Sequence, residues 1–246
     1  MVFENEYGKV EFWSHLSKDP RLPTIENVAV TLSGGVDSAF VMFMLCEFIS
    51  KNNLNIKVMP FTGIDHLRPA NIWYAREVAL YFEEKYPSIK FLPHYEFSYD
   101  HQPNNTMMKR HAHRKHEWNL YNDKNIQVFL CGKSANPPDD EAKKFGLYIN
   151  REAERDTNIG DQSKIFTRIV DNGEYNRWIY RPLAFMHKKF IAECFKDHNL
   201  LDDLFPITAS CIGYANTTKN FSEPCKTCWW CKEKYWSFGM YDGGVK

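Results

Sequence analysis

One segment constrains the fold more than any other part of the chain: residues 28–38, which read Val-Ala-Val-Thr-Leu-Ser-Gly-Gly-Val-Asp-Ser. Its first half is apolar and β-branched, which predicts a buried strand. The adjacent Gly34 and Gly35 predict a tight turn, and the apolar run from Ala39 to Ile49 predicts a helix. A strand, a glycine turn and a helix in this order direct backbone N–H groups toward an anion above the helix N-terminus. The segment therefore predicts a phosphate-binding loop.

The side chains of this loop suit a nucleotide. Ser33 and Ser38 supply hydroxyl donors, and Asp37 can cap the helix or hold Mg²⁺ near the phosphates. The patterns G-x-x-x-x-G-K-[ST] and G-x-G-x-x-G are not matched here, so neither of those nucleotide folds is implied. The alternative is an ordinary Ser/Gly turn without a ligand. The residues expected to bind the nucleotide through this loop are Ser33, Gly34, Gly35, Val36, Asp37 and Ser38.

The rest of the chain alternates short apolar segments with amphipathic ones, which predicts an α/β fold with a parallel twisted sheet and helices on both faces. Strands are expected at 27–32, 56–61, 89–97 and 127–131, and helices at 38–51, 68–86, 106–121 and 185–200. Residues 1–26 are expected to form a lead-in, and residues 134–173 a long functional loop or lid. Ligands bind at the carboxyl ends of such strands. We therefore expect Thr62 and Lys133, which follow two of the strands, to contact the nucleotide; a surface position is the alternative for Lys133.

The bulk properties limit the partners of the protein. The chain has 246 residues, 43% of them hydrophobic, which suits one large domain with an appendage. Its 31 basic and 31 acidic side chains give a formal net charge of zero, which does not favour non-specific binding to nucleic acid or membranes. No signal peptide or bilayer-spanning run is visible. We expect a cytoplasmic protein that binds small molecules and contacts neither membrane nor nucleic acid directly, and the aromatic content permits a homodimer.

Four of the seven cysteines gather near the C-terminus: Cys211, Cys225, Cys228 and Cys231. The repeated C-x-x-C spacing lets thiolates meet at one ion, and four sulfur ligands satisfy tetrahedral zinc. A closed four-sulfur shell predicts a structural Zn²⁺. Free or disulfide-bonded cysteines and an iron–sulfur cluster are the alternatives. We expect a nucleotide-binding domain over residues 1–205 and a zinc-binding tail over 206–246.

The loop at 33–38 resembles the S-G-G-x-D-S pyrophosphate loop of the PP-loop ATP-pyrophosphatase superfamily, whose fold is Rossmann-like. Three further segments narrow the resemblance to 7-cyano-7-deazaguanine synthases. These are Arg-Pro-Leu-Ala-Phe-Met-His-Lys at 181–188, Thr-Ala-Ser-Cys at 208–211, and the C-x-x-C-x-x-C series at 225–231.

This resemblance implies an ATP-dependent C–N ligase with Mg²⁺ as cofactor. ATP would adenylate 7-carboxy-7-deazaguanine with release of pyrophosphate, ammonia would displace AMP to give an amide, and a second activation would give the nitrile. The implied catalytic residues are Asp37, Lys188 and Arg181. Lys188 would bind a phosphate or the substrate carboxylate, with a solvated position at a helix start as its alternative, and Arg181 would hold a carboxylate with two hydrogen bonds.

The chain also departs from that family. The interval between Cys211 and Cys225 is long, His187 occupies a position that is often acidic, and no Y-P-D-C-R segment is found. The substrate therefore stays open. A tRNA-modifying enzyme such as a thiolase, a relative that joins a different amine, and a non-enzymatic nucleotide-binding scaffold are the alternatives. His111, His113 and His116 suggest either a solvated basic helix or a second metal or RNA site.

Overall fold

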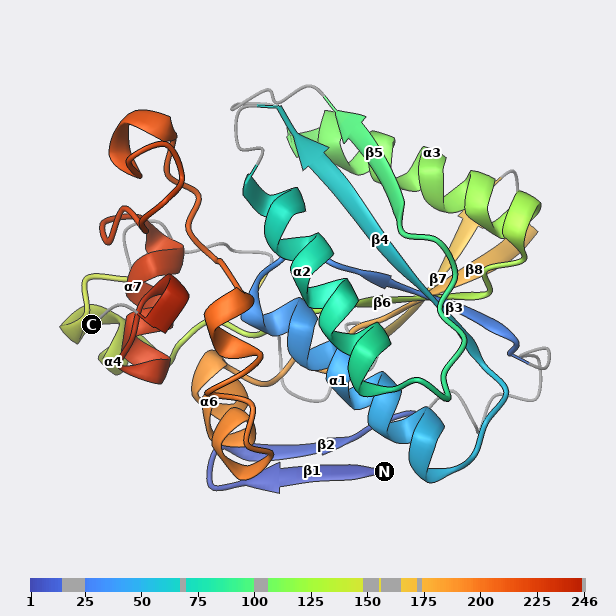
Figure 1. The fold of residues 1–246 in the computed structure, drawn as a ribbon, viewed down its shortest axis with the longest axis horizontal. Coiled ribbons are helices and arrows are strands. Elements are labelled where there is room, and N and C mark those ends of the chain that lie inside the picture. The colour runs from blue at the N-terminus through green and yellow to red at the C-terminus, as the bar shows by residue number, and fades with distance from the viewer. Residues whose placement is uncertain are drawn as a thin grey trace.

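The computed structural model describes residues 1–14, 25–66, 70–99, 106–147, 155, 165–171 and 174–244, with the backbone alone over 106–111 and 166–177. Its centre is a six-stranded sheet (Figure 1). Five strands are parallel, and the edge strand β7 is antiparallel to β8. In sheet order the strands are β5 (Tyr95–Tyr99), β4 (Lys57–Asp65), β3 (Asn27–Thr31), β6 (Val128–Cys131), β8 (Glu174–Tyr180) and β7 (Phe166–Asp171).

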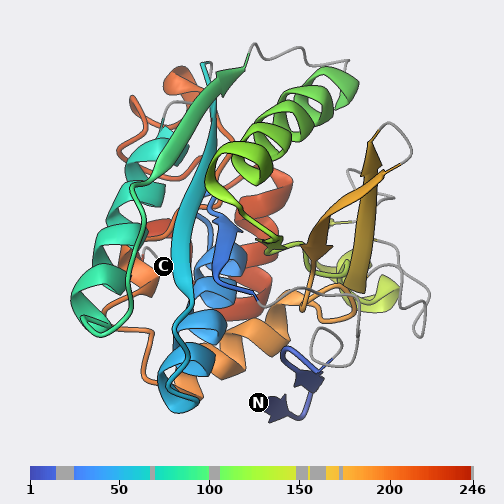
Figure 2. The same ribbon diagram turned by 90° about the vertical axis from the view of Figure 1, so that its right-hand side faces the viewer.

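Helices cover both faces of the sheet, as Figure 2 shows for α2 and α3. Successive side chains of a strand point to opposite faces. Val28 and Val30 of β3 therefore pack on the side of α1 (Val36–Lys51), α2 (Ala70–Lys85) and α6 (Lys188–Asp197). Ala29, between them, packs on the side of α3 (Thr106–Lys124). The structure confirms the predicted α/β fold.

Several of the predicted elements differ in extent. The second strand, expected at 56–61, continues as β4 to Asp65, so Thr62 lies within it and does not follow it. The third strand was expected at 89–97, but β5 begins at Tyr95, and Phe91 makes only an isolated bridge to Val58. Pro93 has no N–H to donate, which interrupts the ladder. The expectation of one long loop over 134–173 is wrong in its described part, because this range contains α4 (Asp139–Lys144) and β7.

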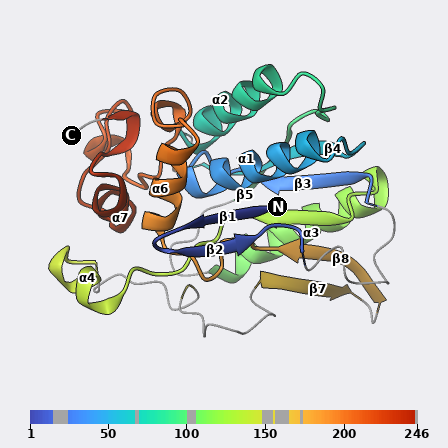
Figure 3. The same cartoon turned by 90° about the horizontal axis from the view of Figure 1, so that it is seen from below.

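The N-terminal lead-in contains an antiparallel hairpin, β1 (Val2–Asn5) and β2 (Gly8–Glu11). The hairpin lies beside α6 (Figure 3), where the side-chain amide of Asn5 donates to the carbonyl oxygen of Phe190 at 3.0 Å. Among the described residues, no helix combines the length and the apolar character that a bilayer crossing requires.

The C-terminal part consists of short helices around α7 (Trp229–Phe238), namely η3 (Phe205–Ile207), η4 (Ala215–Thr217) and η5 (Asp242–Gly244). It packs against the main body through aromatic rings. Phe238 of α7 lies 4.8 Å from Phe205 and 5.4 Å from Phe195 of α6, measured between ring centroids. This packing brings α7 to the same end of the molecule as the start of α6 (Figure 1).

Candidate active site and four-cysteine centre

The predicted phosphate loop joins β3 to α1. Gly34 has a left-handed φ of +79°, and a Cβ there would lie 2.8 Å from the Cβ of Tyr74, so this position requires glycine. The buried hydroxyl of Ser38 donates to the Gly35 carbonyl oxygen (3.0 Å) and accepts from the Ser33 N–H (3.2 Å). Ser38 thus stabilises the turn. The N-cap of α1 is Gly35, which has no side chain that could cap the helix. The first turn of α1 is therefore available to an anion.

A cavity of about 590 Å³ lies over this loop at the carboxyl edge of the sheet. It brings together most of the residues predicted to bind or act, which are Ser33, Gly35, Val36, Asp37, Ser38, Lys133 and Lys188. Gly34, Thr62 and Arg181 do not line it. Thr62 is buried in the sheet, where its hydroxyl donates to the Leu32 carbonyl oxygen (2.7 Å) and contacts His94 Nε2 (2.8 Å). Arg181 follows β8, and its N–H donates to Ile165.

Four charged side chains form a network in the wall of the cavity, and three of them are almost fully buried. Lys188 Nζ, at the start of α6, lies 3.4 Å from Asp37 Oδ2 and 3.0 Å from Glu233 Oε2. The other oxygen of Glu233 accepts from Arg155 Nη2 at 2.5 Å. Exposed side-chain fractions are 5% for Lys188, 1% for Glu233 and 8% for Arg155. Water screens such a network little, so its charges interact strongly.

The electrostatic balance keeps these groups charged. Burial alone would lower the pKa of Lys188, but the carboxylates of Asp37 and Glu233 outweigh it and hold this pKa above its ordinary value. Burial alone would raise the pKa of Glu233, but Lys188 and Arg155 outweigh it and hold this pKa below its ordinary value. Lys188 is therefore a fixed positive charge beside the phosphate loop.

Asp37 has one carboxylate oxygen in use and one without a partner. Oδ2 accepts from the Ser134 hydroxyl at 3.0 Å and faces Lys188, whereas Oδ1 is buried and makes no hydrogen bond. A buried carboxylate oxygen without a partner is costly unless a ligand satisfies it. Mg²⁺ prefers such oxygen ligands close to phosphate groups. Asp37 thus fits the predicted magnesium-binding role.

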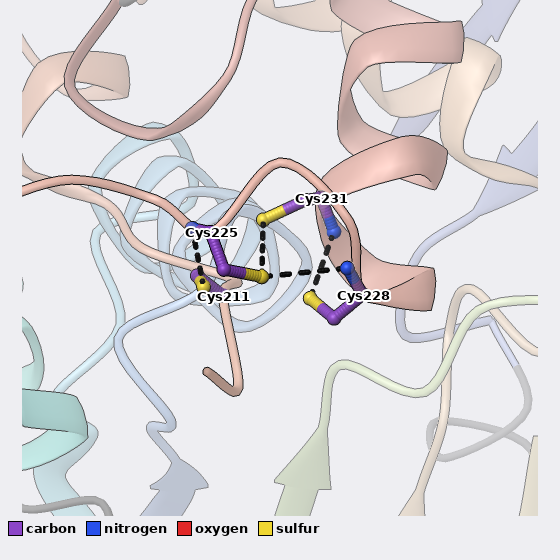
Figure 4. Close-up of side chains that lie close together, drawn as sticks. All are labelled: Cys211, Cys225, Cys228 and Cys231. Carbon is purple, nitrogen blue, oxygen red and sulfur yellow. Dashed lines mark hydrogen bonds between the residues drawn. The ribbon is translucent and has the colours of Figure 1, made fainter. Parts of the chain in front are cut away.

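The four C-terminal cysteines also come together (Figure 4). Their Sγ atoms all lie within 4.8 Å of one another, and those of Cys225 and Cys231 are 3.9 Å apart. Tetrahedral zinc with Zn–S bonds of 2.3 Å needs sulfurs about 3.8 Å apart. Backbone N–H groups donate to the Sγ atoms of Cys211, Cys225 and Cys228 at 3.2–3.4 Å. The cluster can bind zinc, and these N–H groups would stabilise thiolate ligands.

Hydrogen bonds among the thiols divide their protons unequally. The bond to Cys211 holds the pKa of Cys228 far below its ordinary value, at about 2, and raises the pKa of Cys211 to about 12. A cationic metal favours the thiolate form of all its cysteine ligands.

A buried salt bridge fixes the segment between the cavity and the cysteines. Asp242 accepts hydrogen bonds from the N–H groups of Ser210 and Cys211 at 2.8–2.9 Å. It also pairs with Lys234 Nζ at 2.6 Å, and Lys234 donates to the Thr208 carbonyl oxygen. Ser210 and Cys211 line the cavity, so this salt bridge shapes one wall of the site.

The sequence analysis missed Glu233 and Arg155. Each lies in a different part of the chain from Lys188, so no local spacing could reveal the network. The histidine-rich helix also differs from expectation. His116 stacks on Phe97 of β5 (4.2 Å between centroids) and its Nδ1 contacts the Tyr95 hydroxyl, while His113 packs edge-on against Phe97. These two histidines pack on the sheet, and the side chain of His111 lies outside the described residues.

Known proteins include one sequence relative and one structure that are similar to this chain. No protein-family model matches the chain. The chain is 26% identical over 179 residues to tRNA(Ile)-lysidine synthase of Rickettsia akari (strain Hartford). That lysidine synthase belongs to the PP-loop ATP-pyrophosphatase superfamily. The match covers 72% of this chain but only 37% of the relative, so the chain spans little more than a third of its length.

Among solved structures, the chain is similar to the U34-tRNA thiolase NcsA from Methanococcus maripaludis with its [4Fe-4S] cluster. The TM-score is 0.43 and the sequence identity 16%, over 73% of this chain and 59% of that one.

Proposed function

We propose that this protein is an ATP-dependent enzyme that transfers AMP from ATP to an oxygen atom of an acceptor and releases pyrophosphate. The observation that carries the proposal is the pairing of Lys188 with Asp37 at the edge of a cavity built over the Gly34–Gly35 turn. A cation and a carboxylate beside open helix N–H groups suit the phosphates of a nucleotide and their magnesium ion.

In this proposal the chain binds and orients the triphosphate. The N–H groups of the loop and the first turn of α1 hold the β and γ phosphates, and Lys188 neutralises charge that builds on the leaving pyrophosphate. Asp37 would ligate Mg²⁺, which supplies further charge neutralisation when it is bound. The acceptor oxygen forms a bond to the α phosphorus as the bond to the bridging oxygen breaks. AMP on that oxygen is a good leaving group, which an amine or another nucleophile can then displace.

Two acceptor classes have support. The similarity to tRNA(Ile)-lysidine synthase favours a base of a tRNA, so a tRNA-modifying reaction is the first candidate. The second candidate is 7-carboxy-7-deazaguanine with ammonia as the amine. This candidate is supported by four motifs that occur in the same order along the chain as in 7-cyano-7-deazaguanine synthases. They are the phosphate loop, the segment ending at Lys188, Thr-Ala-Ser-Cys at 208–211 and the three later cysteines.

Products of radiolabelled ATP test the proposal. The purified protein should release AMP and pyrophosphate, rather than ADP and phosphate, when its acceptor is present. Parallel reactions with bulk tRNA plus amino acids, and with 7-carboxy-7-deazaguanine plus ammonia, distinguish the two classes, since mass spectrometry reports a modified nucleoside or an amide or nitrile.

Asp37→Asn should reduce AMP release at least about 100-fold, the scale of losing one transition-state contact. The matched control is Asp140→Asn, which changes an exposed aspartate of α4. Equal AMP release by Asp37→Asn and the unaltered protein would show that the loop is not the reaction site.

A further inference from the structure

Glu233 is the most deeply buried member of the charged network, and it makes contact with two cations. Its side chain is 1% exposed. One carboxylate oxygen lies 3.0 Å from Lys188 Nζ, and the other accepts from Arg155 Nη2 at 2.5 Å. Arg155 in turn donates from Nε to the Ser134 carbonyl oxygen at 2.9 Å and from Nη2 to the Ser134 hydroxyl at 3.1 Å.

These contacts join Glu233 to both polar partners of Asp37. Lys188 Nζ faces Asp37 Oδ2, and the Ser134 hydroxyl donates to that same oxygen. Lysine has a long, flexible stem that does not by itself fix the position of its ammonium group. Glu233 anchors that group as a second carboxylate beside Asp37, and through Arg155 it also anchors Ser134. One buried carboxylate therefore sets the positions of the groups that orient Asp37.

The position of Glu233 depends in turn on the four-cysteine centre. Glu233 lies on α7 two residues after Cys231, and Cys228 caps this helix by accepting from the Cys231 N–H at 3.4 Å. The first turn of α7 is therefore part of the cysteine centre, and Glu233 directly follows that turn.

We infer that Glu233 is a positioning residue, which holds Lys188 and Arg155 at the phosphate loop and links the four-cysteine centre to the nucleotide site. This inference deepens the proposed function and relies on it for the catalytic readout. Glu233 does not act on ATP itself. It sets the geometry of Lys188, so its loss should reduce turnover more than it reduces nucleotide binding.

Glu233→Gln keeps the shape of the side chain and removes its charge. We expect its kcat for AMP release to fall at least tenfold while the KM for ATP changes less than threefold. Glu233→Asp restores the charge with a shorter reach and should recover part of kcat. The control is Glu193→Gln, which removes an ion pair with Lys196 on the outer part of α6 and should leave both constants unchanged.

A second readout does not depend on catalysis. Brief acetylation followed by mass spectrometry measures the accessibility of each lysine. In the unaltered protein Lys188 should react slowly, because it is 5% exposed and paired with two carboxylates. In Glu233→Gln the labelling of Lys188 should rise severalfold, whereas that of the exposed Lys144 should not change. The bound metal should stay constant, since Glu233 is not a ligand.

The outcomes separate the two proposals. If the unaltered protein releases no AMP with any acceptor, the proposed function fails, and lysine labelling still decides the role of Glu233. If Glu233→Gln keeps both the kcat and the Lys188 labelling of the unaltered protein, the inference is overturned and the proposed function stands. Should Glu233→Gln fail to fold, Glu233→Asp gives the same two readings, because its shorter side chain keeps the charge but does not hold Lys188 and Arg155 together in the same way. A folded Glu233→Asp protein with the kcat and the Lys188 labelling of the unaltered protein would equally overturn the inference.

Discussion

The carbonyl oxygen of Gly34 accepts a hydrogen bond from the backbone N–H of Ala209 at 2.8 Å. Gly34 lies in the phosphate loop between β3 and α1, and Ala209 lies in the Thr-Ala-Ser-Cys segment that leads to the cysteine centre. The loop between β3 and α1 is thus hydrogen-bonded directly to the C-terminal part of the chain. The cavity over the loop is therefore bounded by both segments.

The salt bridge between Asp242 and Lys234 should be essential to this attachment. Asp242→Asn would leave a fully buried lysine without its carboxylate and weaken the hydrogen bonds to Ser210 and Cys211. Breaking a buried ion pair in this way costs about 3–5 kcal/mol. Denaturant titration should show that loss in the free energy of unfolding. The exposed Asp202→Asn is the control and should stay within about 0.5 kcal/mol of the unaltered protein. A similarly small change for Asp242→Asn would contradict the importance of this salt bridge.

Three glycine-to-alanine changes should separate backbone strain from nucleotide binding. Gly34→Ala combines a left-handed φ with a clash against Tyr74 and the Asn71 carbonyl oxygen, and should destabilise the fold by about 2 kcal/mol or more. Gly239→Ala has a similar φ of +68° with open space around it, and should cost only about 1 kcal/mol. Gly35 has a φ of −88°, so Gly35→Ala should fold normally. Thermal or chemical unfolding of the three variants checks this order.

The same Gly35→Ala variant should bind ATP at least about tenfold more weakly, because its methyl group occupies the approach of a phosphate to the loop. Isothermal titration with ATP and Mg²⁺ measures this affinity. Undiminished affinity in a stably folded Gly35→Ala protein would mean that phosphates do not approach the loop at this glycine.

Elements that are apolar over one continuous segment are predicted best from the sequence. β3 and α1 are apolar along most of their length, and both were found close to their predicted limits. The hairpin at residues 2–11 was missed because each of its four-residue strands has a single buried side chain, Phe3 or Val10. One apolar residue per strand gives no detectable periodicity.

For the site, the sequence predicts residues whose role depends on local spacing. The glycine turn and the C-x-x-C repeats have such spacing. In the structure most residues of the glycine loop line one cavity, and the four cysteines form one cluster. The contacts of Glu233 with Lys188 and Arg155 depend on how three distant segments pack, and no single segment encodes them. The division into units 1–205 and 206–246 stays a prediction.

Acid should weaken the fold partly through His94. The Thr62 hydroxyl donates its one proton to Leu32, so it accepts from His94 Nε2–H, and Nδ1 of the neutral ring carries no proton. Burial lowers the pKa of His94 below its ordinary 6.5, an effect that Glu96 only partly opposes. At a pH between the lowered pKa of His94 in the folded protein and 6.5, the unfolded chain binds one proton more than the folded protein does. The free energy of unfolding therefore falls as the pH falls below about 6.5.

His94→Gln keeps the donor to Thr62 and removes the titration. Urea unfolding at pH 7 and pH 5 should therefore show a smaller loss of stability on acidification for His94→Gln than for the unaltered protein. The expected difference is about 1.4 kcal/mol for each unit by which the pKa is lowered. An equal or larger loss in the variant would assign the acid sensitivity to other groups.

Removal of the metal should disturb both the tail and the ATP site. Cys228→Ser removes a thiolate ligand but keeps a side chain that can cap α7, so the protein should lose its bound metal, expected at about one equivalent, and unfold at a lower temperature. Turnover of ATP should fall as well, because Glu233 lies on the first turns of α7 and pairs with Lys188. Elemental analysis distinguishes zinc from iron. Cys131→Ser, outside the cluster, should keep the full metal content. A Cys228→Ser protein that retains its metal and its unfolding temperature would show that these four thiols do not form a metal site.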